Sequence, residues 1–308
     1  MKILITGGAG FIGSSIISEL QASGHLLYVI DNLSFGKREL ANVSDSFFSK
    51  VDIRDKEKIE LIFEEFKPDC LLHLAAIHFI PYCNKNPKET IEVNMQATLN
   101  LLNIAKKYKK LKGVFLASTA AVYPIHDEAI NESLAPEPVD IYGISKLMCE
   151  HLIHEFYLET SINCTIFRFF NAFGPNETNP HLIPEIFNQI KNGNRVIKLG
   201  NLEPKRDFIH THDMSKAVRG LIENPVKGYD IFNLGRGIEY SVEDVVKAFE
   251  KAIQSSITIE QDISRMRKTD RMHLLADVTK LKNYLNWEPK QSLESGIKQM
   301  VSLLNNGL

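Results

Sequence analysis

Short apolar runs alternate with helix-like segments through the first half of this 308-residue chain, and this alternation restricts the possible folds strongly. The helix-like segments include 11–23, 56–67 and 87–108, the last with Pro87 in its first turn. Strands that are apolar throughout and joined by helices are typical of a parallel sheet covered on both faces. We therefore predict an α/β fold with strands at 2–6, 26–30, 70–76, 113–118 and 163–169.

The second part of the chain is less regular. Helices are expected at 181–193 and 213–224, and SVED (241–244) is a capping-box pattern that opens another. SLES (292–295) lacks the closing acid but precedes a similar apolar run. We predict a smaller, mixed carboxyl-terminal lobe, with the chain crossing between the two parts more than once. The predicted boundaries are 1–170 with 208–235 for the sheet domain, and 171–207 with 236–308 for the lobe.

Composition excludes several classes of function. The formal net charge of −2 gives no bulk attraction to nucleic acid or to an anionic membrane. The four cysteines are scattered without a CxxC pair, so we expect neither a disulfide framework nor a zinc site. No 18-residue apolar stretch could span a bilayer, and MKILITGG lacks the apolar run of a signal peptide. We expect a cytoplasmic protein that binds no metal, nucleic acid or membrane.

A glycine-rich turn, TGGAGFIG (6–13), directly follows the first predicted strand and opens the first helix. Glycines allow a tight turn and a close approach of the backbone to a pyrophosphate, and the helix N-terminus offers free N–H groups. The spacing is GxxGxxG rather than the commoner GxGxxG, and no Lys-Ser/Thr follows as in a Walker loop. A purely structural turn is the alternative. We predict a dinucleotide-binding turn formed by Gly7, Gly10, Phe11, Ile12 and Gly13.

An acidic residue, Asp31, ends the second predicted strand. A carboxylate there can bind both adenosine ribose hydroxyls and repels a 2′-phosphate, which favours NAD over NADP. Lys37 and Arg38 lie nearby and could instead bind a phosphate, and Asp31 could simply form a turn. Asp52 and Ile53 would suit the adenine amide and face, with a structural role as the alternative. The remaining predicted cofactor contacts are Asn32, Ser34, Gly36, Leu74, Ala75, Ala76 and His78.

The segment YGISK places Tyr142 and Lys146 four residues apart at the start of a predicted helix. Positions i and i+4 lie on one face of a helix, so the phenol and the ammonium can be neighbours. ASTAAVYP (117–124) follows a predicted strand, so Ser118 and Thr119 lie at the carboxyl edge of the sheet, where open α/β sheets bind ligands. A solvated surface pair is the alternative for the tyrosine and lysine.

These motifs together carry a resemblance. TGGAGFIG, DNLSFG, HLAA, STAAVY, YGISK, RFFNAFGP and RDFIH occur in the order seen in the extended short-chain dehydrogenase/reductase superfamily. More narrowly, the whole chain resembles nucleotide-sugar epimerases of the NAD-dependent epimerase/dehydratase family. The resemblance implies a Rossmann-type doubly wound sheet that binds NAD, a smaller substrate lobe, and a homodimer assembled through helices 87–108 and 142–160.

The resemblance also implies catalytic roles. Tyr142 would be the acid/base, and Lys146 would bind the nicotinamide ribose and lower the pKa of the tyrosine. Thr119 would hydrogen-bond the sugar oxygen that becomes a ketone. The 4,6-dehydratases of the family carry an Asp-Glu pair after this threonine, but here Ala120 and Ala121 follow. We therefore expect 4-epimerisation through a transient 4-keto sugar; a dehydratase, a reductase and an inactive dinucleotide-binding scaffold are the alternatives.

The resemblance implies that Asn171, Arg206 and Arg271 contact the substrate, the two arginines at its diphosphate. A turn role for the asparagine and surface ion pairs for the arginines are the alternatives. UDP is expected by family analogy alone, and the sugar stays open between hexoses, their N-acetyl forms and uronic acids. The chain departs from the family in 77–87, in VYP (122–124) where VYG is usual, and in 176–184. We expect these departures to influence sugar specificity.

Overall fold

The computed structural model describes residues 1–177, 179–263 and 271–305. Its main element is a seven-stranded sheet in the order β10-β6-β5-β4-β1-β2-β3, in which every neighbouring pair is parallel. The strands are β1 (Lys2–Thr6), β2 (Leu26–Asp31), β3 (Phe48–Lys50), β4 (Cys70–His73), β5 (Gly113–Thr119), β6 (Asn163–Phe169) and β10 (Tyr229–Leu234). The predicted α/β fold with a Rossmann-type sheet is confirmed.

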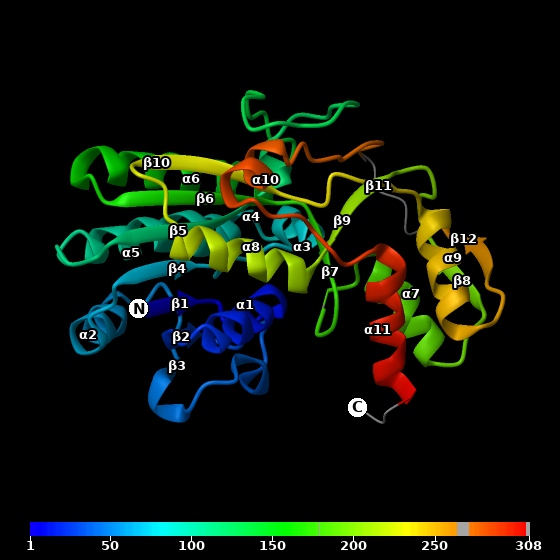
Figure 1. Ribbon diagram of the computed structural model, residues 1–308, viewed down its shortest axis with the longest axis horizontal. Helices are drawn as coiled ribbons and strands as arrows, with labels where there is room; N and C mark the ends of the chain where they lie inside the picture. The colour runs from blue at the N-terminus through cyan, green and yellow to red at the C-terminus, as the bar shows by residue number, and fades with distance from the viewer. Residues whose placement is uncertain (178, 264–270, 306–308) are drawn as a thin grey trace.

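Helices cover both faces of this sheet (Figure 1). On one face α1 (Phe11–Ala22) packs against α8 (Thr211–Glu223), with α10 (Thr279–Leu285) beside them. On the other face lie α2 (Lys56–Phe66), α5 (Ala97–Ala105) and α6 (Ile141–Thr160). Each face buries a separate set of aliphatic and aromatic side chains against the strands, as expected when both sides of a parallel sheet are apolar. The short elements are α3 (Ile80–Lys85), η1 (Arg38–Ala41), η2 (Asp45–Phe47) and η4 (Ala120–Val122).

The other strands and helices form a smaller mixed part. β7 (Asn171–Phe173) pairs in parallel with β9 (Arg206–His210), which pairs antiparallel with β11 (Glu239–Tyr240). β8 (Val196–Leu199) pairs with β12 (Thr258–Gln261). Around them lie α7 (Leu182–Lys191), α9 (Val242–Ile253) and α11 (Leu293–Asn305) (Figure 1). The chain returns from β9 to the main sheet through α8 and β10, but the exact domain boundaries remain a prediction.

Local sequence signals explain the starts of two helices in the smaller part. Ser241 and Asp244 form the predicted capping box at the start of α9, and the Ser295 N–H donates to the Ser292 hydroxyl at the start of α11. The long helix predicted over 87–108 is instead interrupted. It consists of α4 (Pro87–Ile91), a π-helical turn, η3 (Glu92–Gln96), and α5. Such π turns occur often at functional sites, and this one lies beside α6, which carries Tyr142 and Lys146.

The sheet order places the site. Because all seven strands are parallel, their carboxyl ends meet at one edge, and the strand order reverses on either side of β1. Ligands bind open α/β sheets outside this edge, near the reversal. The glycine turn after β1, Asp31 at the end of β2, and Thr119 at the end of β5 therefore face the same side of the molecule.

Candidate functional site

The glycine turn after β1 is tightly packed except at one position. Gly7 has φ +74°, and a Cβ there would lie 2.6 Å from the backbone of Ala75; a Cβ at Gly13 would lie 2.7 Å from the Gly7 carbonyl oxygen. At Gly10, the N-cap of α1, a Cβ would meet only the Gly7 oxygen, at 3.5 Å. No side chain caps this helix start. Open space next to uncapped N–H groups fits the diphosphate of a dinucleotide.

Asp31 holds two backbone turns together. Its carboxylate accepts hydrogen bonds from the N–H groups of Ala9 (3.0 Å) and Leu33 (2.8 Å), while burial raises its pKa and these two bonds lower it. Gly36 lies against the glycine turn, because a Cβ there would be 2.7 Å from the Ala9 oxygen. The Ser34 N–H donates to the Asn32 side chain at 3.0 Å. Asp31 and Gly36 thus border the glycine turn, and Asn32 and Ser34 lie in the loop between them.

Arg38, the possible phosphate ligand, is engaged elsewhere. Its guanidinium donates to the Val43 carbonyl (2.8 Å) and the Asp45 carboxylate (2.7 Å), and lies over the Phe48 ring. These contacts direct its charge away from Asp31. The geometry therefore favours ribose hydroxyls over a 2′-phosphate at the end of β2.

Asp52 and Ile53 follow β3 directly. The Asp52 carboxylate accepts two hydrogen bonds from the Arg54 side chain, both 2.8 Å, and one from the Asn32 amide at 2.9 Å. The bonds from Arg54 hold the pKa of Asp52 well below its usual range. Ile53 is buried, with 6% of its surface exposed. Asp52 is thus linked through Asn32 to the loop that begins at Asp31.

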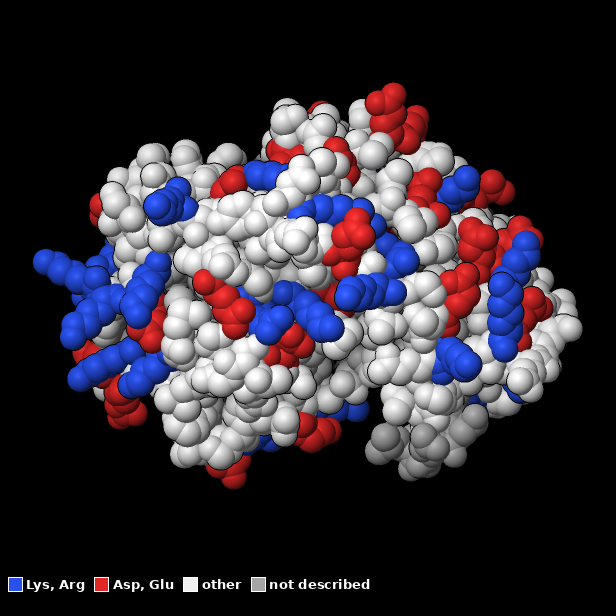
Figure 2. Space-filling view, viewed as in Figure 1, with Lys and Arg blue, Asp and Glu red and all other residues white. Residues whose placement is uncertain are grey.

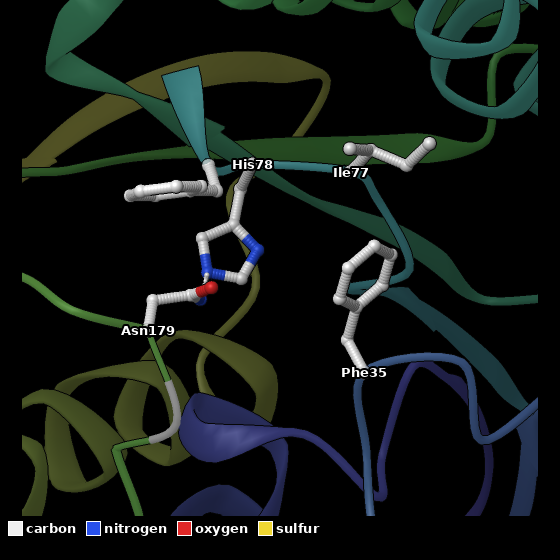
Figure 3. Close-up of a pocket in the computed structure, with 5 residues that line it drawn as sticks. Phe35, Ile77, His78 and Asn179 are labelled. Atoms are coloured by element: carbon white, nitrogen blue, oxygen red, sulfur yellow. Dashed lines mark hydrogen bonds between the residues drawn. The ribbon is translucent and has the colours of Figure 1, made fainter. Parts of the chain in front are cut away.

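The end of β4 lies across the glycine turn from β2. Leu74, Ala75 and Ala76 are half-buried, and the Leu74 N–H donates to the Thr6 carbonyl at 3.0 Å. His78, three residues beyond Ala75, is exposed and forms a 2.8 Å hydrogen bond with the Asn179 side chain. Figure 3 shows the His78 ring between Asn179 and Phe35, at a small cavity. His78 therefore connects the strand edge to the loop that precedes α7.

The predicted catalytic residues Thr119 and Tyr142 lie beside each other beyond the end of β5. Thr119 is the last residue of this strand; its hydroxyl accepts from the Ala121 N–H at 3.1 Å, and its interaction with the Tyr142 phenol lowers the pKa of that phenol. Tyr142 and Lys146 lie in the first turns of α6, whose start is capped by the Asp140 carboxylate through the Gly143 N–H. Lys146 is only 2% exposed and forms no salt bridge with any residue of the described chain.

The electrostatic expectation for Tyr142 is not met in the structure of the chain. Burial raises the pKa of Tyr142 above its ordinary value, and the hydrogen bond with Thr119 is the largest opposing effect. Burial also lowers the pKa of Lys146, because the loss of solvation disfavours its charged form. Lys146 is not among the larger influences on the tyrosine. The predicted lowering of the tyrosine pKa by Lys146 is therefore outweighed by the loss of solvation.

Asn94, in the π-helical turn, was missed by the sequence reasoning. Its buried amide accepts from the Ile77 N–H (2.8 Å) and donates to the Ile77 carbonyl (2.9 Å) and the Ser145 hydroxyl (2.9 Å). It thus joins the loop after β4 to α6. An asparagine inside an otherwise apolar helical pattern is a poor helix former, and this was the available signal.

A buried histidine continues this network. His73, at the end of β4, lies 2.6 Å from the Thr6 hydroxyl and 2.8 Å from the Thr98 hydroxyl. Thr98 donates to the Asn94 carbonyl at 2.5 Å, so it accepts from Nε2–H of His73, and Nδ1 accepts from Thr6. Burial lowers the pKa of His73 to about 3, so the ring is neutral at physiological pH.

The predicted substrate residues lie on the smaller part of the molecule. Asn171 is half-buried on β7, beside β9, which begins with Arg206. Arg206 donates to the Arg271 carbonyl oxygen at 2.6 Å. The Arg271 guanidinium donates to the carbonyl oxygens of Pro124 (2.7 Å) and Tyr123 (2.8 Å), both in the segment after Thr119. The structure therefore links the two arginines to each other and to the turn that follows Thr119.

Other kinds of site are not found in the described part of the chain. Over residues 1–177, 179–263 and 271–305, no group of three or more His, Cys, Asp or Glu side chains could hold a metal ion. None of the helices within these ranges combines the length and apolarity needed to cross a membrane. Acidic side chains lie among the basic ones over most of the face in Figure 2.

Known proteins resemble this chain over nearly its whole length. The family model described as GDP-mannose 4,6 dehydratase matches residues 4–300. The GDP-6-deoxy-D-talose 4-dehydrogenase of Aggregatibacter actinomycetemcomitans is 32% identical over 92% of this chain and 91% of its own length. The UDP-glucose 4-epimerase of Bacillus subtilis is 31% identical over 96% of this chain and 94% of its own.

A solved structure agrees with these sequence relatives. The UDP-glucose 4-epimerase of Thermus thermophilus, crystallised in complex with NAD, has a TM-score of 0.90 to this chain at 28% identity, over the full length of both chains. The similarity therefore extends through the smaller part of the molecule as well as the sheet.

Proposed function

The chain belongs to the GDP-mannose 4,6 dehydratase family, within the NAD-dependent epimerases and dehydratases of the extended short-chain dehydrogenase/reductase superfamily, and we propose that it is a UDP-sugar 4-epimerase. Its cofactor is NAD. The observation that carries the proposal is that Thr119 and Tyr142 lie beside each other at the carboxyl edge of the sheet, with Lys146 buried one helical turn further along α6. The substrate is a UDP-hexose or a UDP-hexuronate.

The glycine turn and its neighbours hold the dinucleotide. The first turn of α1 donates N–H groups to the diphosphate, and Asp31 accepts from the adenosine ribose hydroxyls. Arg38 is turned toward Val43 and Asp45, which supports NAD over NADP. The buried ammonium of Lys146 donates to the nicotinamide ribose. Asn32, Ser34, Gly36, Asp52, Ile53, Leu74, Ala75, Ala76 and His78 remain proposed contacts.

The reaction at the sugar uses two side chains of this chain. Thr119 donates a hydrogen bond to the C4 oxygen, and Tyr142 takes the proton from that hydroxyl and later returns it. Bound NAD would supply the acceptor and donor for the hydride at C4, and Thr119 and Tyr142 would hold the C4 oxygen between the two transfers. Burial raises the pKa of Tyr142 in the chain itself, and a cationic nicotinamide ring nearby would favour the phenolate.

The residues after Thr119 argue against a dehydratase. Ala120 is 2% exposed and Ala121 is half-buried, and neither side chain can transfer a proton. Removal of a C5 proton and loss of the C6 hydroxyl need acid and base groups at this place. Return of the hydride to the opposite face of the 4-keto sugar, in contrast to dehydration, requires no further acid or base group.

A reductase is the second candidate, favoured by the 32% identity to a GDP-6-deoxy-D-talose 4-dehydrogenase. The two reactions differ in redox balance. An epimerase recovers its NAD at each turnover, whereas a dehydrogenase changes the amount of free reduced dinucleotide in proportion to product. Asn171 and Arg206 are the proposed contacts to the sugar and the diphosphate in either case.

The test is incubation of the purified protein with NAD and a panel of UDP-hexoses, their N-acetyl forms and UDP-hexuronates. We expect NMR to show inversion at C4 of at least one sugar, with no net change in absorbance at 340 nm. A stoichiometric absorbance change with a GDP- or UDP-sugar would favour the reductase. Lack of conversion anywhere on the panel would contradict the proposal.

Tyr142→Phe tests the proton-transfer role. We expect turnover to fall by at least about 10³-fold, because no group replaces the phenol, while NAD binding measured by calorimetry changes little. Thr160→Val, at the far end of the same helix, is the control and should keep full activity. An active Tyr142→Phe enzyme would remove tyrosine from the mechanism.

Two further proposals concern the assembled protein. Ile144 and Met148 are each about two-fifths exposed on α6, which supports a homodimer through this helix and its neighbours. Sedimentation analysis at micromolar concentration should give twice the chain mass; a monomer would contradict the proposal. The cytoplasmic location expected from the scattered cysteines also stays a proposal, and fractionation of the source cells would test it.

A further inference from the structure

We propose that Arg271 is a positioning residue whose guanidinium holds the turn that carries Thr119. The expected effect on kcat rests on the proposed function. The statement that Arg271 holds the turn does not depend on it. This positioning role differs from the role expected of Arg271 in the sequence, which was direct contact with the substrate diphosphate. The two roles have separate experimental consequences.

The guanidinium contacts three carbonyl groups of one turn, those of Ala121, Tyr123 and Pro124. Nη1 donates to the Pro124 carbonyl oxygen at 2.7 Å, and Nη2 donates to the Tyr123 carbonyl oxygen at 2.8 Å. Nη2 also approaches the Ala121 carbonyl oxygen at 3.4 Å, the outer limit of a hydrogen bond. A planar guanidinium with several donors suits converging carbonyl groups better than an ammonium does.

The sequence of the turn explains why it needs an outside donor. Thr119 caps the 3₁₀ turn η4, and the Tyr123 N–H donates to the Ala120 carbonyl at 3.2 Å. The next bond of this type would run from residue 124 to the Ala121 carbonyl. Residue 124 is proline, which has no N–H, so the turn stops and its carbonyl groups need other donors. Arg271 supplies them.

The turn is held from its other side by the catalytic helix. Gly143 approaches the Ala121 carbonyl so closely that a Cβ at this position would overlap the oxygen. The Tyr123 hydroxyl donates to the buried Asn233 amide oxygen at 2.7 Å. Release of the turn at Arg271 would therefore alter the distance between Thr119 and α6, which carries Tyr142.

Arg271 is itself anchored in the smaller part of the molecule. The Lys205 N–H donates to the Met272 carbonyl, and the Asp207 N–H donates to the Leu274 carbonyl, both at 2.8 Å. Between these two bonds, Arg206 donates to the Arg271 carbonyl at 2.6 Å. The guanidinium thus extends from a fixed backbone, which suits a positioning role.

The first experiment compares kinetics and affinity for Arg271→Gln. We expect kcat to fall about tenfold or more, because a small displacement of Thr119 weakens catalysis, while the dissociation constant of UDP alone, measured by calorimetry, stays within twofold. A tenfold loss of UDP affinity, or an unchanged kcat, would overturn the proposal. Arg236→Gln is the control, because Arg236 also donates to a backbone carbonyl, that of Gln291, but does not contact the turn.

The second experiment uses the proline. Pro124→Ala removes the restriction that favours the extended conformation of Tyr123 (ψ 159°) and supplies an N–H, so the turn can continue to the Ala121 carbonyl and should recover part of the lost kcat when combined with Arg271→Gln. Arg271→Lys should be intermediate between the parent and Arg271→Gln. Equal kcat values for Arg271→Gln with and without Pro124→Ala would overturn the role assigned to the turn.

A third readout does not depend on activity. Hydrogen exchange followed by mass spectrometry should show at least tenfold faster exchange of amides 120–123 in Arg271→Gln than in the parent or Arg236→Gln. Unchanged exchange would overturn the proposal even if kcat fell. If the parent converts no sugar on the panel, the proposed function fails, and this measurement still decides whether Arg271 holds the turn.

Discussion

At the scale of single residues, the glycines of the turn differ in why a side chain is absent: two are required by the fold, and one leaves space for a ligand. The close contacts at Gly7 and Gly13 are with backbone atoms of the chain itself, so glycine is needed there for the fold. Gly10 meets only one atom, 3.5 Å away, so the fold would accept a side chain there. The free space at Gly10 is then explained by the diphosphate that the turn is proposed to bind.

This difference predicts opposite behaviour for two alanine variants. Gly10→Ala should lower the free energy of unfolding by less than about 1 kcal/mol but weaken NAD binding at least tenfold, because its methyl group occupies the diphosphate position. Gly13→Ala should cost about 2 kcal/mol or more, because its methyl group meets the Gly7 carbonyl. Urea unfolding of the cofactor-free variants and calorimetry with NAD would check both; normal NAD affinity in Gly10→Ala would contradict the assignment.

At the scale of elements, the π-helical turn η3 connects parts of the site that are distant in sequence. The Asn94 side chain hydrogen-bonds to the backbone N–H and C=O of Ile77 and to the hydroxyl of Ser145. The Thr98 hydroxyl connects the backbone carbonyl of Asn94 to His73 at the end of β4. The network is buried, and each of its hydroxyl and imidazole groups can be assigned one donor and one acceptor role. It therefore holds the loop after β4 in register with α6, and so with Tyr142 and Lys146.

Asn94→Ala should accordingly destabilise the protein by about 3 kcal/mol, because it leaves the buried N–H and C=O of Ile77 without partners. Turnover should fall as well, since α6 loses a contact near its start. Asn100→Ala is the matched control on α5, because among the described residues the Asn100 side chain has one hydrogen bond, accepted from Gln96 at 3.4 Å. Chemical unfolding would measure both, and equal losses of stability would contradict the special role of Asn94.

At the scale of the whole molecule, three buried titratable groups influence stability in acid. Burial lowers the pKa of His73 to about 3 and that of His210 to about 4, and raises the pKa of Asp207 to about 6. In the unfolded chain, histidine titrates near pH 6.5 and aspartate near pH 3.9. Each histidine therefore takes up a proton on unfolding below about pH 6.5, while Asp207 releases one between about pH 4 and 6.

The balance of proton uptake and release on unfolding predicts a net loss of stability in acid. As the pH falls from about 6 to 4.5, the two histidines favour the unfolded chain because each takes up a proton on unfolding. Asp207 releases a proton on unfolding and so cancels the effect of one histidine. From these groups the free energy of unfolding should fall by about 1.4 kcal/mol per pH unit. His73→Gln should leave His210 and Asp207 to offset each other, giving a nearly flat dependence. Urea unfolding between pH 7 and 4.5 would measure both, and an identical slope in the variant would contradict this account.

Much of the architecture and the outline of the site followed from the sequence. Apolar strands alternating with helices are a local pattern, and a parallel sheet has few ways to bury them, so the sheet and its active edge could be predicted. The glycine turn, Asp31, Thr119 and YGISK could be placed because each adjoins the end of a predicted strand or the start of a helix. These predictions depend on order along the chain, and all seven parallel strands preserve that order at one edge.

Tertiary structure decided what depends on contacts between distant segments. The positions of Asn94 and His73 in one network, the interruption of helix 87–108, and the contact of Arg271 with the turn after Thr119 join residues that are far apart in sequence. The pKa of Tyr142 belongs to the same class, because the loss of solvation that raises it arises from packing of the whole site. A sequence pattern specifies which groups are present, but their solvation and partners depend on how the complete chain packs.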